Sequence, residues 1–221
     1  MPASIKVVKL LLPEIILLCI SVSYLFSSFS YTYLISKPIY SIGLFCGAYA
    51  LVQIFTLKVI WPWSKKSKVI NLLFTDSEPV TQWINALVLS IGLWITAHIM
   101  FVLFGAPLLN SALETTISAA LTSSLIFCPS LALIGSDIMK WYQVIVCGKH
   151  NNNQERFVYM HSVSVVLATW ISAVVIPLDW DRPWQEWPIP PAYGSVIGHC
   201  MALFGNSLLS LKEMKSSGKL K

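Results

Sequence analysis

Six long apolar runs, separated by short polar stretches, dominate this 221-residue sequence. They cover about 8–30, 38–60, 81–104, 110–134, 156–177 and 191–211. Each run holds roughly 20 residues or more, enough for an α-helix to cross a hydrocarbon layer of about 30 Å. Strands of a membrane barrel would be about ten residues long and would alternate in polarity, which these runs do not. The sequence therefore predicts an all-α integral membrane protein, with a bundle of six transmembrane helices forming one polytopic domain over 1–221.

The charged residues predict how this bundle is oriented. Hydrophobic residues make up 56% of the chain and charged residues 11%, which is less than half of the charge of an average soluble domain, about 25%. With an even number of spans, all but two of the 15 basic residues lie on one side of the membrane, the exceptions being Lys37 and Arg182. Because basic residues concentrate in cytosolic segments, we expect both termini in the cytosol. The net charge of +5 then reflects topology rather than nucleic-acid binding.

Small residues repeat at helical spacing in several runs. Close approach of two helix backbones needs such residues, because lipid removes the hydrophobic effect that joins helices in water. Two interpretations remain open for these stripes: packing inside this bundle, or docking onto another membrane protein. The second run contributes Gly43 and Gly47, the sixth contributes Gly194, Gly198 and Ala202, and the fifth contributes Ser164, Ala168 and Ser172.

Ionisable residues at membrane depth are costly and are therefore candidates for function. His98 precedes the turn Phe104–Asn110, and Glu114 follows it. The expected topology puts this turn, with Gly105, Ala106 and Pro107, on the non-cytosolic side. His161 and His199 are interpreted as hydrogen-bonded groups. The five cysteines lie far apart in the sequence, so no pattern indicates a zinc or redox site.

The segment IPLDWDRPWQEWPIP (Ile176–Pro190) concentrates aromatic and charged residues on that same side. Its prolines favour a stiff connection, because they cannot all fit one helix. Three tryptophans suit the membrane interface, and three acids surround Arg182, whose guanidinium can bind a carboxylate or a phosphate. The segment is either a rigid cap in which an acid pairs with Arg182, or a docking surface for a partner or a lipid headgroup. The residues are Asp179, Trp180, Asp181, Trp184, Glu186 and Trp187.

Catalysis in the segment is a weaker interpretation. Asp179 and Asp181 resemble the paired aspartates of metal-dependent glycosyltransferases, but Arg182 beside them would compete for their charge. The sequence has no zinc-protease motif, phosphate-binding loop or nucleophile elbow. Group transfer usually needs one of these or a metal cluster.

Two stretches, HIMFVLFGAPLLNSALET (His98–Thr115) and VIPLDWDRPWQEWPIP (Val175–Pro190), resemble the signature regions of the PIG-F family. The resemblance covers roughly a sixth of the chain in specific residues. Members of that family act in glycosylphosphatidylinositol (GPI)-anchor biosynthesis in the endoplasmic reticulum. The residues that carry the likeness are Phe104, Gly105, Ala106, Pro107, Leu108 and Glu114 in the first stretch, and Pro177, Leu178, Asp179, Trp180, Asp181, Arg182, Trp184, Gln185, Trp187 and Pro188 in the second.

The resemblance implies a non-catalytic subunit that binds and stabilises a large polytopic ethanolamine phosphate transferase in the endoplasmic reticulum membrane. It implies no cofactor for this chain, since the metal ions of such a complex belong to the catalytic partner. We expect the tryptophan-rich segment to act as a lumenal clamp that fixes the last two helices and contacts the partner. The alternative is an autonomous lipid transporter or flippase, with a polar path near Glu114, His98 and Arg182. A third hypothesis is a membrane enzyme that uses Asp179 and Asp181.

Overall fold

The computed structural model describes residues 23, 36–55, 79–107 and 110–216, and within these residues it contains helices and no strand. The all-helical prediction is therefore confirmed for the described part. Short helical segments lie in the connections between the long helices. They are α7 (Ile138–Trp141), the π-helical turn η3 (Tyr142–Val146) and the 3-10 turn η4 (Pro183–Gln185). The long helices are α3 (Pro38–Phe55), α5 (Pro79–Leu103), α6 (Ala112–Ile134), α8 (Asn153–Ala173) and α9 (Ile189–Ser216).

These long helices correspond to five of the predicted runs, with ends that differ by a few residues. The first run, 8–30, lies outside the described residues, apart from residue 23, and so does the end of the second run, 56–60. α9 begins at Ile189, two positions before the expected start, and takes Pro190 and Pro191 into its first turn. Proline fits there because the first N–H groups of a helix have no partner within it.

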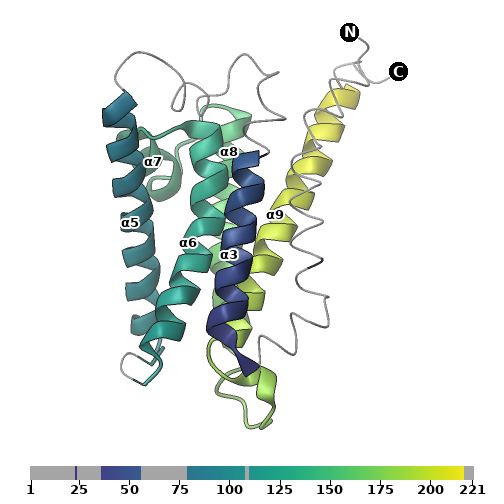
Figure 1. The fold of residues 1–221 in the computed structure, drawn as a ribbon. Helices are drawn as coiled ribbons and strands as arrows, with labels where there is room; N and C mark the ends of the chain where they lie inside the picture. Colours follow the sequence, from purple (N-terminus) through teal and green to yellow (C-terminus); the bar gives the residue numbers. More distant parts are fainter. Residues whose placement is uncertain (1–22, 24–35, 56–78, 108–109, 217–221) are drawn as a thin grey trace.

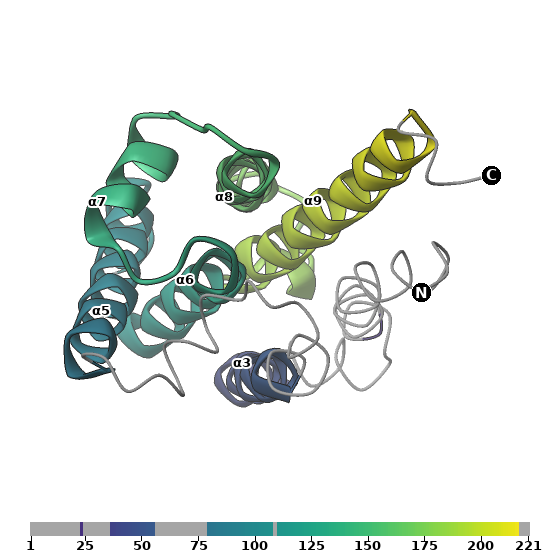
Figure 2. The same ribbon diagram turned by 90° about the horizontal axis from the view of Figure 1, so that it is seen from above.

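The long helices lie side by side, and α6 occupies the centre, where it contacts α3, α5, α8 and α9. Seen from above, α5 forms one edge of the bundle (Figure 2). One end holds the end of α5, the start of α6 and the connection from α8 to α9, and we name it the cap end; it is at the bottom of Figure 1. The opposite end holds α7 and the start of α8.

The pair α8 and α9 has the most extensive contact in the described bundle, and two glycines allow it. A Cβ atom at Gly194 would lie 2.5 Å from the carbonyl oxygen of Ala168, and one at Gly198 would lie 2.5 Å from that of Ser164. Ser164 also donates its hydroxyl to the carbonyl oxygen of Gly198, at 2.9 Å. The backbones of the two helices therefore touch where any larger residue would separate them.

The glycines of α3 are in a different situation. Gly43 and Gly47 are exposed, and a Cβ atom at either would meet no described atom within 4 Å. They border a shallow apolar groove that α3 forms with Ile117 of α6. Packing against a described helix therefore does not account for this pair. Ala202, the last residue of the α9 stripe, is half-buried.

Polar residues lie inside the bundle. His161 on α8 and His199 on α9 are fully buried, and Nε2 of the first lies 2.8 Å from Nδ1 of the second. Nε2 of His199 lies 3.3 Å from the hydroxyl of Tyr49 on α3. A chain of hydrogen bonds thus joins three helices, in agreement with the interpretation of both histidines as hydrogen-bonded groups.

The outside of the bundle is apolar, whereas buried positions include serine, threonine and histidine. Exposed large hydrophobic residues follow the outer faces of the helices, among them Trp83, Leu87, Ile95, Val166, Ile171, Met201 and Phe204. A helix of a soluble protein turns its apolar face inward, so this distribution is the one expected of a bundle in lipid. Among the described helices, Val80–Leu103 meets the length and composition needed to cross a membrane. The count of six spans and the cytosolic position of both termini remain predictions.

Candidate functional site

The two signature stretches meet at the cap end, and Trp187 joins them. Its indole Nε1–H donates to the hydroxyl of Thr115 at the start of α6, at 3.1 Å. Its ring stands edge-on to Phe101 of α5, with centroids 5.5 Å apart. The Thr115 hydroxyl in turn reaches the carbonyl oxygen of Pro107, at 3.0 Å. One side chain of the α8–α9 connection therefore contacts the end of α5 and the start of α6.

The residues Phe104-Gly105-Ala106-Pro107 end α5 and start the turn into α6. Gly105 has a φ of 93°, a backbone conformation that glycine adopts without the penalty other residues pay. The amide of Ala106 donates to the carbonyl oxygen of Phe101, at 2.9 Å, which closes the helix end in the manner of a Schellman motif. Gly105, Ala106 and Pro107 thus shape the turn that presents a carbonyl to Thr115. Leu108 lies outside the described residues.

Gln185 holds the α8–α9 connection together. Its side chain is buried, with 6% of the residue exposed. The side-chain amide donates to the carbonyl oxygens of Val175, at 2.8 Å, and Leu178, at 2.7 Å. Its carbonyl oxygen accepts from the backbone amide of Arg182, at 3.0 Å. Every bond runs to the backbone, so one glutamine fixes the path of the connection without using any other side chain.

The residues Leu178–Arg182, which precede Gln185 in the α8–α9 connection, have exposed side chains. We name this stretch the exposed edge. Trp180 is 54% exposed, and its ring lies 5.9 Å from that of Trp184, which is half-buried against the core. Asp181 has a φ of 49°, an uncommon conformation for a residue with a Cβ atom. Among the described residues, Arg182 forms no ion pair with Asp179, Asp181 or Glu186. The described residues therefore show no pairing of an acid with Arg182.

The other predicted site residues lie near the cap end without forming one polar cluster. His98 on α5 and Glu114 in the first turn of α6 are half-buried. No hydrogen bond or ion pair links His98, Glu114 and Arg182 to one another in the described part of the chain. Pro188 is buried at the start of α9. Within the described ranges, no three His, Cys, Asp or Glu side chains lie close enough together to share a metal ion.

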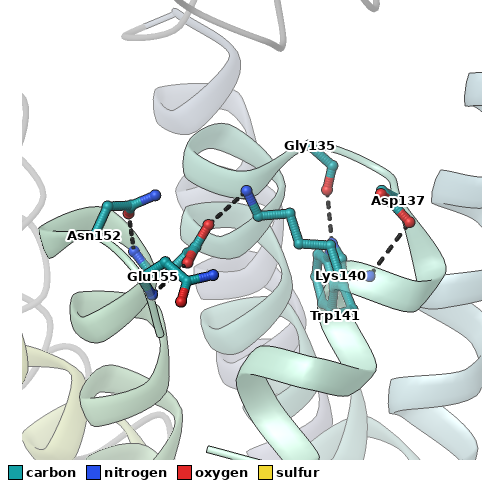
Figure 3. A network of polar contacts seen from close by, with 7 residues as sticks. Gly135, Asp137, Lys140, Trp141, Asn152 and Glu155 are labelled. Carbon is teal, nitrogen blue, oxygen red and sulfur yellow. Dashed lines mark hydrogen bonds and ion pairs between the residues drawn. The ribbon is translucent and has the colours of Figure 1, made fainter. Parts of the chain in front are cut away.

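A second polar arrangement, at the opposite end of the bundle, was not predicted (Figure 3). Lys140 of α7 forms an ion pair with Glu155 of α8, with 2.6 Å between Nζ and Oε1. The other carboxylate oxygen of Glu155 accepts from the amide of Asn151, at 2.8 Å, and its own amide donates to the side chain of Asn152, at 2.8 Å. Trp141 donates its indole N–H to the carbonyl oxygen of Gly135, at 2.6 Å.

The polar composition of Gly148–Arg156 is typical of a solvated loop, and most of it is exposed, but α8 begins at Asn153 and Glu155 is only 5% exposed. The hydrogen bond from Lys140 and that from the amide of Asn151 hold the pKa of Glu155 below its ordinary value. Glu155 is therefore a charged, fixed group. The spacing Asn152-x-x-Glu155 is a capping-box pattern, and it is the sequence signal that could have identified this helix start.

Comparison with known proteins identifies the family. Residues 16–207 match the family described as "GPI biosynthesis protein family Pig-F". Over 127 residues the chain is 33% identical to the human protein named "GPI ethanolamine phosphate transferase, stabilizing subunit". It is 34% identical over 127 residues to the mouse protein of the same name. It is 35% identical over 115 residues to "Glycosylphosphatidylinositol anchor biosynthesis protein 11" of Debaryomyces hansenii.

These matches cover part of each protein. The aligned segment spans 58% of this chain and 58% of the human and mouse proteins, and 52% of this chain and 49% of the Debaryomyces protein. No solved structure matches the chain. The family match, in contrast, extends over most of the sequence and includes both stretches that meet at the cap end. The chain therefore belongs to the Pig-F family of GPI biosynthesis proteins.

Proposed function

We propose that this chain is a non-catalytic, stabilising subunit of a GPI ethanolamine phosphate transferase in GPI-anchor biosynthesis. The names of the human and mouse relatives support this assignment. In the proposal, the chain is a multi-pass protein of the endoplasmic reticulum membrane with both termini in the cytosol. It binds the membrane region of the large catalytic subunit, which carries the metal ions and performs the reaction.

One observation carries the proposal furthest: the second signature stretch divides into a fixed part and an exposed part. The side chains of Gln185 and Trp187 form hydrogen bonds to other residues of this chain. Asp179, Trp180 and Arg182 are exposed, and no ion pair within the described residues uses the charge of Asp179 or of Arg182. Exposed tryptophan and arginine on a rigid support are the residue types that dominate binding energy at interfaces. We therefore assign partner binding to the exposed edge and structural support to Gln185 and Trp187.

The rigid support matters energetically as well. An interface that must order a loop on binding loses part of its energy to that ordering. Here the hydrogen bonds between the side chain of Gln185 and backbone groups fix the connection before any partner arrives. The exposed edge is thus a pre-formed surface in the proposal, and its rigidity favours a stable complex over a transient one.

The test is purification of the tagged chain from its native membranes in mild detergent, with mass spectrometry of the proteins that remain bound. We expect a large polytopic ethanolamine phosphate transferase in stoichiometric amount. Trp180→Ala and Arg182→Ala should each lower its recovery about tenfold or more, the loss typical of an interface hot spot. Both positions are exposed, so the variants should themselves be recovered at the level of the unmodified chain.

Trp83→Ala is the matched control. Trp83 is 51% exposed, close to the 54% of Trp180, but it lies at the start of α5, away from the cap end. Its replacement should leave recovery of the partner unchanged. A well-folded chain that brings no transferase with it would contradict the proposed function. Equal losses in the Trp83 and Trp180 variants would contradict the assignment of binding to the exposed edge.

A further inference from the structure

A polar cleft of about 300 Å³ lies at the end of the bundle opposite the cap, between the α7–η3 segment and the start of α8. It is distinct from the exposed edge. Side chains cap both helices that form its wall: Asp137 caps α7, and Asn152 caps α8. The cleft is lined by Asp137, Met139, Lys140, Gln143, Val144, Lys149, Asn151 and Glu155.

The two lysines that line the cleft differ in their ion pairing. Lys140 is paired with Glu155, a carboxylate that is nearly inaccessible to solvent and also accepts a backbone amide (Figure 3). Lys149 is exposed and forms no ion pair with a described residue. One oxygen of Asp137 already accepts two amides of α7. The cleft therefore offers one uncommitted ammonium group, on Lys149, and a second one, on Lys140, that Glu155 holds in place.

Neutral hydrogen-bond donors stand beside these cations. The side-chain amides of Gln143 and Asn151 line the cleft, and neither bonds to another described residue. An anion with several oxygen acceptors would meet the ammonium group of Lys149 and two amides, beside the ion pair of Lys140 with Glu155 and the capping carboxylate of Asp137. Phosphate is the biological group with this combination of charge and acceptors, and lysine binds it as a point charge.

The surroundings indicate that the phosphate comes from a lipid. Ile138, Met139, Tyr142 and Val146, on α7 and η3, are exposed large hydrophobic residues beside the cleft. A short helix with apolar residues exposed next to lysines is typical of the membrane interface, where the apolar side chains enter the acyl region and the ammonium groups stay at the headgroups. This arrangement suits a cleft at the level of the lipid phosphates.

We propose that this cleft binds the phosphate group of a phospholipid headgroup in the leaflet opposite the cap end. Lys149 supplies the binding charge, Gln143 and Asn151 donate hydrogen bonds, and Glu155 positions Lys140. The bound lipid would join α7 to the start of α8 and so fix the end of the bundle that the partner-binding edge does not reach. This inference does not depend on the proposed function.

The experiment is native mass spectrometry of the full chain, purified in detergent with its bound partners and titrated with lipid. Dioleoylphosphatidic acid is the probe, and dioleoylglycerol, which has the same acyl chains and no phosphate, is its matched control. We expect the first to bind and the second not to bind. Lys149→Gln should weaken binding about tenfold, the effect of one charge-assisted bond, and Lys149→Arg should retain it. Lys37→Gln, which removes an exposed cation just before the start of α3, should have no effect.

Three results would overturn the proposal. Equal binding of the two lipids would show that the acyl chains alone are recognised. Unchanged binding in the Lys149→Gln variant would place the phosphate elsewhere. Displacement of the lipid by inorganic phosphate at equal concentration would make the cleft a site for free phosphate rather than for a lipid headgroup.

Discussion

Trp187 and Thr115 stand 72 positions apart in the sequence, and a hydrogen bond of 3.1 Å joins the indole of one to the hydroxyl of the other. The contact connects the α8–α9 connection to the first turn of α6. Because Thr115 also bonds to the carbonyl oxygen of Pro107, the two signature stretches of the family form one structural unit. Substitutions in either stretch should therefore affect the same end of the bundle.

Replacing Trp187 with phenylalanine tests this contact. The ring would keep its edge-on packing against Phe101, while the donor to Thr115 would be lost. We expect a loss of about 1 kcal/mol in the free energy of unfolding, the usual net value of one hydrogen bond. In a chain of this size that lowers Tm by about 2–4 °C, measurable by thermal unfolding in detergent. Thr115→Val should cost more, because it also removes the bond to the carbonyl oxygen of Pro107, and the double variant should cost less than the sum of the two.

The glycines of α9 and α3 should respond to alanine in opposite directions. In Gly198→Ala the new methyl group would meet the carbonyl oxygen of Ser164 at 2.5 Å, so α8 and α9 must separate at a cost of about 1–3 kcal/mol. In Gly47→Ala it would meet no described atom within 4 Å. There the greater helix propensity of alanine should stabilise the chain by roughly 0.5–1 kcal/mol. Thermal unfolding of both variants gives the comparison, and a loss in both would contradict it.

Much of this bundle follows from the sequence alone, because membrane-spanning helices have simple requirements. Long apolar runs predict α5 and α6 to within a few residues, since few other structures satisfy the backbone of an apolar run in lipid. Helix ends were less well predicted. Whether Pro190 and Pro191 precede α9 or begin it depends on local backbone geometry, and the structure places both in the first turn.

The sequence could not predict which tryptophans of the tryptophan-rich segment are exposed and which pack against other helices. Trp180, Trp184 and Trp187 all suit an interface, but the structure exposes the first and makes the third a link to α6. What separates them is a contact across 72 positions, and no local pattern encodes its existence. The ion pair between Lys140 and Glu155 was missed for a related reason. The polar stretch that contains both is typical of a loop, whereas tertiary packing makes it the start of a helix.

Tyr49→Phe should reveal how far the buried histidine chain stabilises the bundle. The variant keeps the ring of Tyr49, which stands edge-on to His199 with centroids 5.3 Å apart, and loses the hydroxyl that lies 3.3 Å from Nε2. We expect a loss of about 1 kcal/mol. His199→Leu, which removes the contacts to both Tyr49 and His161, should cost more, because it leaves the buried ring of His161 without a partner. Chemical unfolding in mixed detergent micelles would rank the two variants, and the reverse order would show that the histidines contribute by packing alone.

The ion pair between Lys140 and Glu155 predicts how stability depends on pH. Because the pKa of Glu155 is lower in the folded chain than the unfolded value of about 4.3, its contribution is fully present above that value. The contribution is lost as the pH falls from about 5 toward the folded pKa. Glu155→Gln should cost about 1–2 kcal/mol at pH 7, the value of a partly screened charge-assisted bond. That cost should shrink as the pH falls, so the Tm curves of the two chains should converge in acid. Curves that remain parallel from pH 7 to well below the unfolded pKa of about 4.3 would mean that Lys140 does not hold the charge of Glu155.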